Sequence, residues 1–350
     1  MQWAGDGVPH PDEGGAVPSA IVLAIDTKPL PRRRRLPAFF GIALVTGVAA
    51  TAGLLVEARQ LVDEVQRVPD VAASLSPASS TVDNYLLVGS DSRALGDPNT
   101  GETGGVSGNR SDTIMVLRYD RDDGTAALLS IPRDLYVEVP GHDGRRRINA
   151  AYNDGPAVLV QTVQTALGIP VHHYVEIDFY GFKTLVEALG GVEVCFWFPT
   201  RDLNTGLNIT EPGCHLLDGT QALAYARSRY YEEYREGEWR MDPTSDLGRS
   251  TRQRNFVDLS LQTALAEVKA DPFRAGELVR AISAAIRIDG DLDPFDAGSS
   301  LRRAVGAGLV SYSLPVVPVT VDGNAVLELG DAAGPVLDFF RGTGPAPPAP

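Results

Sequence analysis

An uncharged apolar run over residues 36–56 constrains this chain more than any other feature of its sequence. At about 20 residues, the run is long enough to cross the hydrocarbon core of a lipid bilayer as one helix. Arginines occupy positions 32–35 directly before it, and the segment that follows carries charges of both signs. Because basic residues are retained on the cytoplasmic side of a membrane, this asymmetry predicts one transmembrane helix, with residues 1–35 in the cytoplasm and the rest outside.

A cleaved signal peptide is the alternative interpretation of this run. Its apolar region would be unusually long for a signal peptide, and no convincing cleavage site between small residues follows it. We therefore expect an uncleaved anchor. Residues 1–35 and 343–350 are expected to be disordered tails, and residues 57–81 a stalk and linker that precede a folded domain at 82–342.

Strand-like and helix-like runs alternate after residue 82. Apolar, β-branched runs at 85–88, 114–119 and 125–131 predict strands, and the turn between the last two predicts a hairpin. Further helix-like and strand-like runs alternate from 156 to 198. This order predicts the α/β class, with a mixed central β-sheet flanked by helices on both faces. Later helices are expected at 218–227, 247–268, 278–288 and 295–307, and a last strand at 314–321.

Charged residues stand at the ends of the first two predicted strands. Asp91 and Arg93 follow the first strand, and Arg110 and Asp112 precede the second. Carboxylates suit Mg²⁺ or Mn²⁺, and arginines suit phosphate oxygens, so the four side chains suit a metal-bound phosphate ester or pyrophosphate. From these residues alone, a surface loop with two ordinary ion pairs is the favoured interpretation.

A second group of such residues lies farther along the chain. Arg133 follows the third predicted strand, and Arg227 and Arg229 end the helix at 218–227. Arg249 and Gln253 are four residues apart and share one face of the next helix. Asp246 is placed at or before the start of that helix, and Arg254 is expected on its solvated surface.

The net charge of −14 argues against a nucleic-acid partner, because no basic face is available. A local cluster of arginines can still bind an anion. No Walker loop or cluster of His and Cys with zinc spacing is present in the sequence. ATP and zinc are therefore not the expected partners.

Two cysteines, Cys195 and Cys214, are the only ones in the chain. A domain outside the cell meets an oxidising environment, so we expect a disulfide between them, and two buried free thiols are the alternative. The bridge would stabilise the fold by about 3 kcal/mol in the chain-entropy model.

Seven short motifs occur in one order along the chain. They are GSDSR (89–93), NRSDT (109–113), SIPRD (130–134), INAAY (148–152), LVEALGGVEV (185–194), LDGTQALAYARSR (217–229) and DLGRSTRQ (246–253). In this order, over about residues 82–261, the chain resembles the LytR-CpsA-Psr family of membrane-anchored cell-wall enzymes. The cysteine pair is similar to that of actinobacterial members.

The resemblance implies a phosphotransferase at the outer face of the cell membrane. It would move a glycopolymer from a polyprenyl-diphosphate carrier onto a hydroxyl of peptidoglycan through a phosphodiester bond. By the family's motifs, Asp91 and Asp112 would hold Mg²⁺ (or Mn²⁺). The expected pyrophosphate ligands are Arg93, Arg110, Arg133, Arg227, Arg229, Arg249 and Gln253.

The expected catalytic residues are Asp246, Asp91 and Arg229. Either aspartate is a candidate for the base that accepts the proton of the attacking hydroxyl. Because ligation to Mg²⁺ would make Asp91 a poorer base, we favour Asp246. Two alternative functions remain: a module that binds polyprenyl phosphate without transfer, and a polyprenyl pyrophosphatase. The Gly-rich insert at 94–108 is expected either to act as a lid or to shape the acceptor site.

Overall fold

The computed structural model describes residues 65–79, 81–91, 111–244, 246–271 and 274–348. A mixed sheet of seven strands, in the order β1-β14-β7-β2-β3-β4-β15, forms the centre of this part of the chain. Its strands are β1 (Gln66–Val68), β2 (Val82–Ser90), β3 (Ser111–Asp120), β4 (Ala126–Ile131), β7 (His173–Asp178), β14 (Ile286–Asp289) and β15 (Leu309–Ser313). The predicted α/β class and the mixed central sheet are confirmed.

The strand directions follow from the connections. β3 is antiparallel to both β2 and β4, and a five-residue turn joins it to β4. β7 runs parallel to β2, and β15 runs parallel to β4. The strands β2, β4 and β7 therefore end at the same edge of the sheet, which we call the carboxyl edge.

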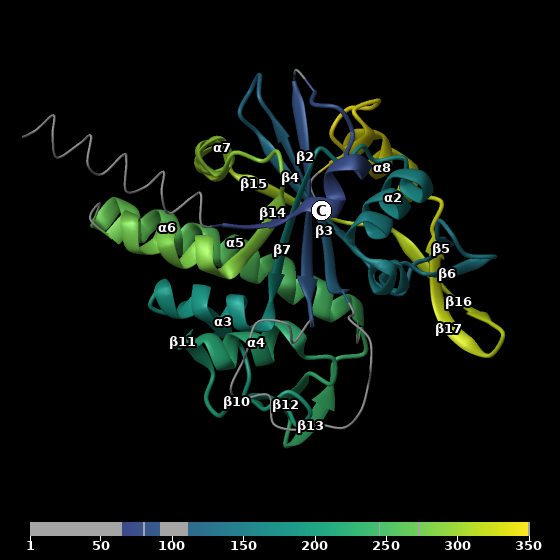
Figure 1. Ribbon diagram of the computed structural model, residues 1–350. Coiled ribbons are helices and arrows are strands. Elements are labelled where there is room, and N and C mark those ends of the chain that lie inside the picture. The colour runs from purple at the N-terminus through teal and green to yellow at the C-terminus, as the bar shows by residue number, and fades with distance from the viewer. Residues whose placement is uncertain (1–64, 80, 92–110, 245, 272–273, 349–350) are drawn as a thin grey trace, which may run out of the picture. The chain divides into compact units, whose positions relative to one another are not determined.

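Helices cover both faces of the sheet (Figure 1). α2 (Pro156–Leu167) and α8 (Ala333–Arg341) lie on one face, and α5 (Asp246–Ala270), α6 (Arg274–Ala285) and α7 (Pro294–Ala307) on the other. Two helices follow strands near the carboxyl edge, α3 (Phe179–Ala188) and α4 (Gly219–Arg227). α3 begins directly after β7, where the Asp178 side chain accepts a hydrogen bond from Gly181 N (2.8 Å).

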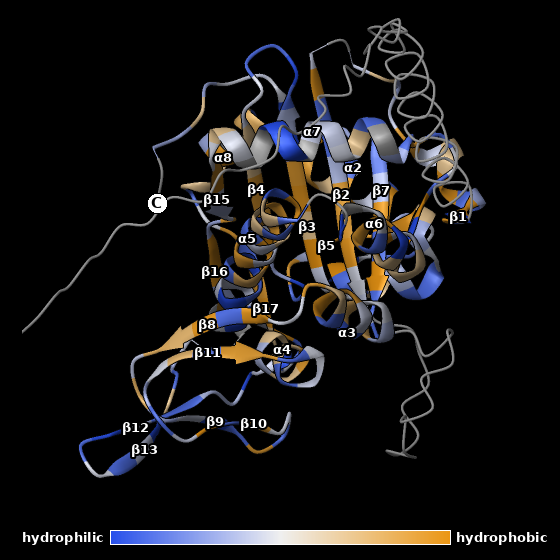
Figure 2. Cartoon of the chain, turned by 90° about the vertical axis from the view of Figure 1, so that its left-hand side faces the viewer, coloured by the Kyte–Doolittle hydropathy of each residue, from blue (hydrophilic) through white to orange (hydrophobic). Residues whose placement is uncertain are grey.

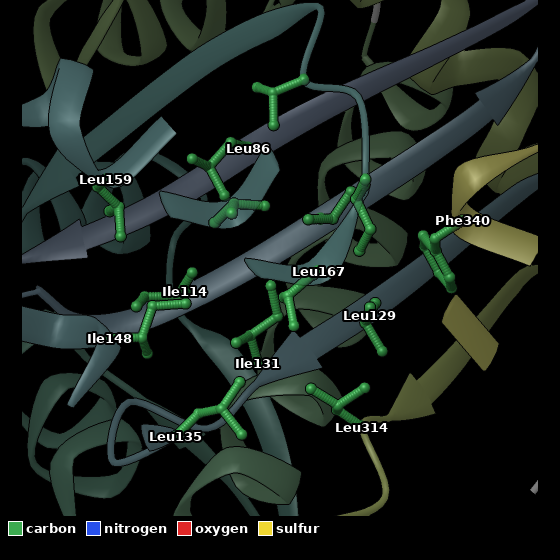
Figure 3. Packing of buried hydrophobic residues seen from close by; sticks show 14 of the residues in the cluster. Leu86, Ile114, Leu129, Ile131, Leu135, Ile148, Leu159, Leu167, Leu314 and Phe340 are labelled. Carbon is green, nitrogen blue, oxygen red and sulfur yellow. The ribbon is translucent and has the colours of Figure 1, made fainter. Parts of the chain in front are cut away.

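Alternation along the strands builds two apolar layers. Leu86, Ile114 and Leu129 face α2 and α8, and Figure 3 shows them beside Leu167 and Phe340. The intervening side chains of the same strands, such as Tyr85 and Tyr119, belong to a separate buried cluster with Ile288 of β14. Fully burying one such side chain contributes about 1.5–3 kcal/mol, so this alternation specifies the strand register. Figure 2 shows the largely hydrophobic strands of this sheet.

A third core lies among α3, α4 and α5 and the hairpin-like pair β8 (Val192–Phe196) and β11 (Gly213–Leu217). Rings of Phe196, Tyr225 and Phe256 pack against one another there. Cys195 and Cys214 stand opposite each other in the β8–β11 pair and form the expected disulfide.

Smaller elements complete the fold. Two short 3₁₀ helices are η1 (Pro69–Ser74) and η2 (Ile148–Asp154). The short strands are β5 (Tyr136–Glu138), β6 (Arg145–Arg147), β9 (Thr200–Asp202), β10 (Leu207–Ile209), β12 (Glu232–Arg235), β13 (Glu238–Met241), β16 (Val316–Val321) and β17 (Asn324–Leu329). β12 and β13 are mostly hydrophilic, in contrast to the central strands (Figure 2).

Several predicted boundaries are wrong. The stalk expected at 57–81 contains β1, which pairs with β14, and Val71 of η1 is fully buried in the main core. The helix expected at 278–288 ends at Ala285, because the chain then continues as β14 between β1 and β7. The strand expected at 314–321 is preceded by β15 and forms a hairpin with β17. In the tail expected to be disordered, the carbonyl of Pro347 accepts a hydrogen bond from the Tyr312 hydroxyl (3.0 Å).

Among the residues that the structure describes, no helix has the length and apolar character needed to cross a membrane. The expected tail at 1–35, the expected anchor at 36–56 and the insert at 94–108 lie outside those residues.

Candidate functional site

Strand register brings the first predicted residues to the carboxyl edge. Ser90 at the end of β2 pairs with Ser111 at the start of β3, so Asp91 and Asp112 lie at neighbouring positions of this edge. Ile131, the last residue of β4, pairs with Ile114, and Arg133 follows two residues later. Arg93 and Arg110 lie outside the described residues.

Gly89 allows β2 and β3 to approach closely just before the edge. A Cβ atom at this position would lie 2.9 Å from Cβ of Thr113, and the strand register shifts between Gly89 and Ser90. This β-bulge changes the direction in which the chain leaves β2 toward Asp91. The glycine of the GSDSR motif is therefore required by the close approach of the two strands.

A buried carboxylate, Glu176 of β7, stands behind the carboxyl edge. Its oxygens accept hydrogen bonds from Ser90 Oγ (2.8 Å), the Tyr152 hydroxyl (2.5 Å) and the Tyr174 hydroxyl (2.8 Å). The guanidinium of Arg287 completes the cluster as an ion pair. Burial, followed by the charge of Glu176, raises the pKa of both tyrosines, so both hydroxyls stay protonated and donate.

This cluster gives the tyrosine of the INAAY motif a structural role. Tyr152 and Ser90, the residue before Asp91, donate hydrogen bonds to the same carboxylate, that of Glu176. Sequence reasoning missed Glu176, although a carboxylate between the apolar residues Val175 and Ile177 of a strand was a signal that could have found it.

Arg133 is largely buried beside two other charged groups. Its Nε lies 3.6 Å from Asp134 Oδ2, and Nε of Arg147 lies 3.4 Å from the other oxygen of the same carboxylate. The carbonyl of Arg133 accepts a hydrogen bond from Asn149 N (3.2 Å). η2 therefore supports the backbone that carries Arg133.

A second buried carboxylate, Asp202 of β9, holds the segment that carries Arg229. It accepts hydrogen bonds from Ser228 Oγ (2.7 Å), Arg229 N (3.1 Å) and Tyr230 N (3.0 Å). Burial alone would raise the pKa of Asp202, but these hydrogen bonds and those from the amides of the β9–β10 turn outweigh burial and lower it. Asp202 is therefore an ionised anchor, and its role was not evident from the sequence.

Arg227 reaches the carboxyl edge by stacking. Its guanidinium lies over the ring of Phe179, 4.3 Å from the ring centroid. Phe179 is the first residue of α3 and follows Asp178, which pairs with Ser90. Arg227 and Asp91 thus stand beside the ends of two neighbouring strands, so the second group of predicted residues lies at the same edge as the first.

The start of α5 is tied to the end of α4 by buried side chains. Gln253 Nε2 donates to the carbonyl of Ala226 (3.0 Å). Arg252 donates to the carbonyl of Ser228 (2.6 Å), pairs with Asp242 (2.9 Å) and stacks on Tyr231. Gln253 and Arg252 therefore position the segment that bears Arg229, which was not expected of Arg252.

Arg249, one turn before Gln253, is 2% exposed. Asp246 is the first residue of α5. The expectation that Arg254 lies on the solvated surface is wrong. Its side chain is buried, its Nη2 donates to Thr251 Oγ1 (3.1 Å), and burial lowers its pKa.

Comparison with known proteins identifies the family to which this chain belongs. The model of the LytR_cpsA_psr family matches residues 56–333. The chain belongs to the LytR_cpsA_psr family. The resemblance inferred from the seven motifs is thereby confirmed.

Relatives within the family share about a third of their residues with this chain. The probable cell wall biosynthesis protein LcpB of Corynebacterium glutamicum is 35% identical over 271 residues, which cover 76% of this chain and 62% of LcpB. The polyisoprenyl-teichoic acid–peptidoglycan teichoic acid transferase TagU of Enterococcus faecalis is 35% identical over 217 residues, which cover 60% of this chain and 62% of TagU. The match thus spans 62% of the length of each relative.

A solved structure supports the same assignment. The LytR-Csp2A-Psr enzyme from Actinomyces oris superposes with a TM-score of 0.63 at 26% identity, over 79% of this chain and 96% of that chain. The mixed sheet and its flanking helices are therefore the fold of the family.

Proposed function

We propose that this chain is a phosphotransferase that moves a glycopolymer from a polyprenyl-diphosphate carrier onto a hydroxyl of peptidoglycan, through a phosphodiester bond. The observation that supports the proposal is that Asp91 and Arg133 follow strand ends along one edge of the sheet and that Arg227 stacks beside another strand end of that edge. Membership in the family and the transferase name of TagU support it.

Fixed cations suit a diphosphate at this edge. A diphosphate that leaves water loses its hydration, and guanidiniums that are already in place offset that loss. The proposed ligands among the described residues are Arg133, Arg227, Arg229 and Arg249, with Arg93 and Arg110 expected from the sequence. As negative charge moves to the departing polyprenyl phosphate, the same guanidiniums stabilise the transition state.

The carboxylates at this edge meet part of what a divalent cation requires. Among the described residues, no three His, Cys, Asp or Glu side chains form a metal-binding group. Mg²⁺, however, is commonly bound by one or two carboxylates together with substrate phosphates, and Asp91 and Asp112 each follow a member of the paired residues Ser90 and Ser111. We propose that Asp91 and Asp112 would hold Mg²⁺ (or Mn²⁺), which would neutralise charge on the diphosphate when bound.

We assign proton removal from the sugar hydroxyl to Asp246, because it begins α5 one turn before Arg249 and has no proposed role in binding the metal. Gln253, whose amide donates to Ala226, is assigned to positioning α5. We further propose that the chain is anchored in the cell membrane by residues 36–56, with the described domain outside the cell. That topology places the site where lipid-linked glycopolymers and peptidoglycan meet.

The test is transfer by the full chain from a synthetic polyprenyl-diphosphate saccharide to a peptidoglycan oligomer, followed by mass spectrometry with and without Mg²⁺. Arg229→Ala should lower the transfer rate on the order of 100-fold, because a preorganised cation is lost. Arg302→Ala, which removes an exposed guanidinium on α7, is the matched control and should behave like wild type.

Three other outcomes would contradict parts of the proposal. Lipid binding without transfer would indicate a binding module. Release of saccharide phosphate alone would indicate a pyrophosphatase. Equal transfer with and without divalent cations would remove Mg²⁺ from the reaction.

A further inference from the structure

A polar cleft opens beside Arg133 and extends from the site described above toward two hairpins that the proposed function does not use. Its volume is about 490 Å³, within the range of about 300–1,000 Å³ that is usual for small-molecule sites. The β5–β6 hairpin, η2 and the β16–β17 hairpin supply its walls. The strands of the two hairpins are labelled in Figure 1. Arg133 lines the cleft at one side, so it is continuous with the proposed diphosphate ligands.

The lining of the cleft is cationic although the chain as a whole is acidic. Three guanidiniums (Arg133, Arg146 and Arg147) face two carboxylates (Asp134 and Asp322), and three asparagine side chains complete the polar lining. In a protein with a net charge of −14, an excess of positive charge in a cavity of this size indicates a local anion site.

Arg146 is the side chain that carries the inference. Its neighbours are engaged: Arg145 pairs with Glu328 (2.6 Å), and Arg147 donates to the carbonyl of Ala325 (2.8 Å) and lies beside Asp134. Within the described residues, no hydrogen bond or ion pair engages the side chain of Arg146, which is exposed at the cleft. A guanidinium in this state is available for a carboxylate or phosphate.

The walls of the cleft are held in place. Leu327 N donates to the carbonyl of Asp134 (3.0 Å), and Ile148 N donates to that of Leu135 (2.7 Å). Together with the Arg145 and Arg147 contacts, these bonds join the two hairpins and η2 into one unit. A ligand would therefore meet a preorganised surface, which lowers the entropic cost of binding.

We infer that this cleft binds an anionic saccharide, with its carboxylate or phosphate on Arg146 and its hydroxyl groups on the asparagine amides. The inference rests on the proposed function, because only a substrate that extends from the diphosphate at Arg133 would place a sugar here during transfer. The anionic group has two sources: the muramyl peptide of the acceptor and the phosphate of the donor polymer.

The test measures saccharide binding to the full chain by titration calorimetry, without any transfer. Three oligomers of equal length serve as probes: neutral N-acetylglucosamine, a muramyl-peptide glycan and a glycerol-phosphate chain. Wild type should prefer a charged oligomer to the neutral one. Arg146→Ala should weaken binding of that charged oligomer about tenfold, by loss of a charge-assisted hydrogen bond, and leave the neutral one unchanged.

Arg302→Ala removes a guanidinium that is also exposed and is carried by α7, on the opposite face of the sheet, and it should bind as wild type does. Preference for the muramyl peptide would assign the cleft to the acceptor, and preference for glycerol phosphate would assign it to the donor. Equal affinity for charged and neutral oligomers, or equal behaviour of the Arg146 and Arg302 variants, would overturn the inference.

Failure of the cleft and failure of the proposed function are distinguishable. If wild type binds the charged oligomers through Arg146 but transfers nothing, the saccharide-binding inference is supported and the phosphotransferase proposal is contradicted. If Arg229-dependent transfer occurs while Arg146→Ala binds every oligomer as wild type does, the saccharide-binding inference is contradicted and the phosphotransferase proposal is supported.

Discussion

The two halves of the candidate site are held by different kinds of contact. At the carboxyl edge, backbone pairing of β2 with β3 and β7, and of β3 with β4, determines where Asp91 and Arg133 stand. At the junction of α4 and α5, three buried side chains hold the backbone of Arg229 instead, namely Asp202, Arg252 and Gln253.

This difference has an energetic consequence. Strand pairing divides its stabilisation among many backbone hydrogen bonds, so that a single side-chain change removes a small share of it. The junction depends on a few charged hydrogen bonds, and a buried group left without its partner costs about 1–3 kcal/mol. Substitutions at the junction are therefore expected to lower the free energy of unfolding more than substitutions at the edge.

The largest effect is expected for Asp202→Ala. It leaves Ser228 Oγ and the amides of Arg229 and Tyr230 without their acceptor, so the free energy of unfolding should fall by about 4 kcal/mol, measured by urea denaturation. Transfer should fall with it, because Arg229 loses its position. A loss below 1 kcal/mol would show that the junction is held by other contacts.

The pH dependence of this contact follows from its lowered pKa. Because the folded-state pKa of Asp202 lies below its unfolded value, its stabilisation is present above about pH 4 and is lost as the pH falls through the folded pKa. The stability difference between wild type and Asp202→Asn should therefore be constant near pH 7 and shrink below about pH 4. A difference that does not change down to pH 3 would contradict the assignment.

Arg252→Met is expected to cost about 3 kcal/mol, because it removes the buried ion pair to Asp242 and the donor to the Ser228 carbonyl. Arg254→Met is the matched control on the same helix. Its arginine is equally buried, and within the part of the chain that the structure describes its side chain donates to Thr251 alone, so the expected loss is below about 1 kcal/mol. Equal losses by urea denaturation would show that burial, rather than the contacts of Arg252, matters at this junction.

At the carboxyl edge, Glu176→Gln should cost about 2 kcal/mol, less than the junction variants. The amide oxygen still accepts from one hydroxyl, and Arg287, whose side chain is 24% exposed, is partly solvated. Denaturation of the single variants and of the double variant with Arg287→Gln would measure the coupling. An effect larger than that of Asp202→Ala would reverse the comparison.

The smallest effect is expected for Gly89→Ala, about 1 kcal/mol, because the new Cβ would press on Thr113 and the strands would shift to accommodate it. Gly290→Ala, where no atom lies within 4 Å of the new Cβ, is the control and should be close to neutral. Thermal unfolding of the two variants gives the comparison directly. Equal melting temperatures would show that β2 and β3 do not need the close approach.

The residues that the sequence predicted and those that it missed differ in how far along the chain their contact partners lie. Asp91, Asp112 and Arg133 were predicted because each stands at the end of a strand that its own apolar pattern reveals. Glu176 was missed because its partners Ser90, Tyr152 and Arg287 lie 86, 24 and 111 residues away. β1 was missed for the same reason, since its partner strand β14 lies more than 200 residues farther along the chain.

The sequence by itself determined the α/β class, the strands that carry the first half of the site, the disulfide and the family, because local periodicity and ordered motifs specify each of them. Only the tertiary structure decided how the second half is held. It buried Arg252 and Arg254 where a solvated helix face was expected for Arg254, gave Asp202 its role, and formed a cationic cleft from two distant hairpins. A charged side chain is buried only where the fold brings it a partner, and partners separated by tens of residues leave no local pattern to read.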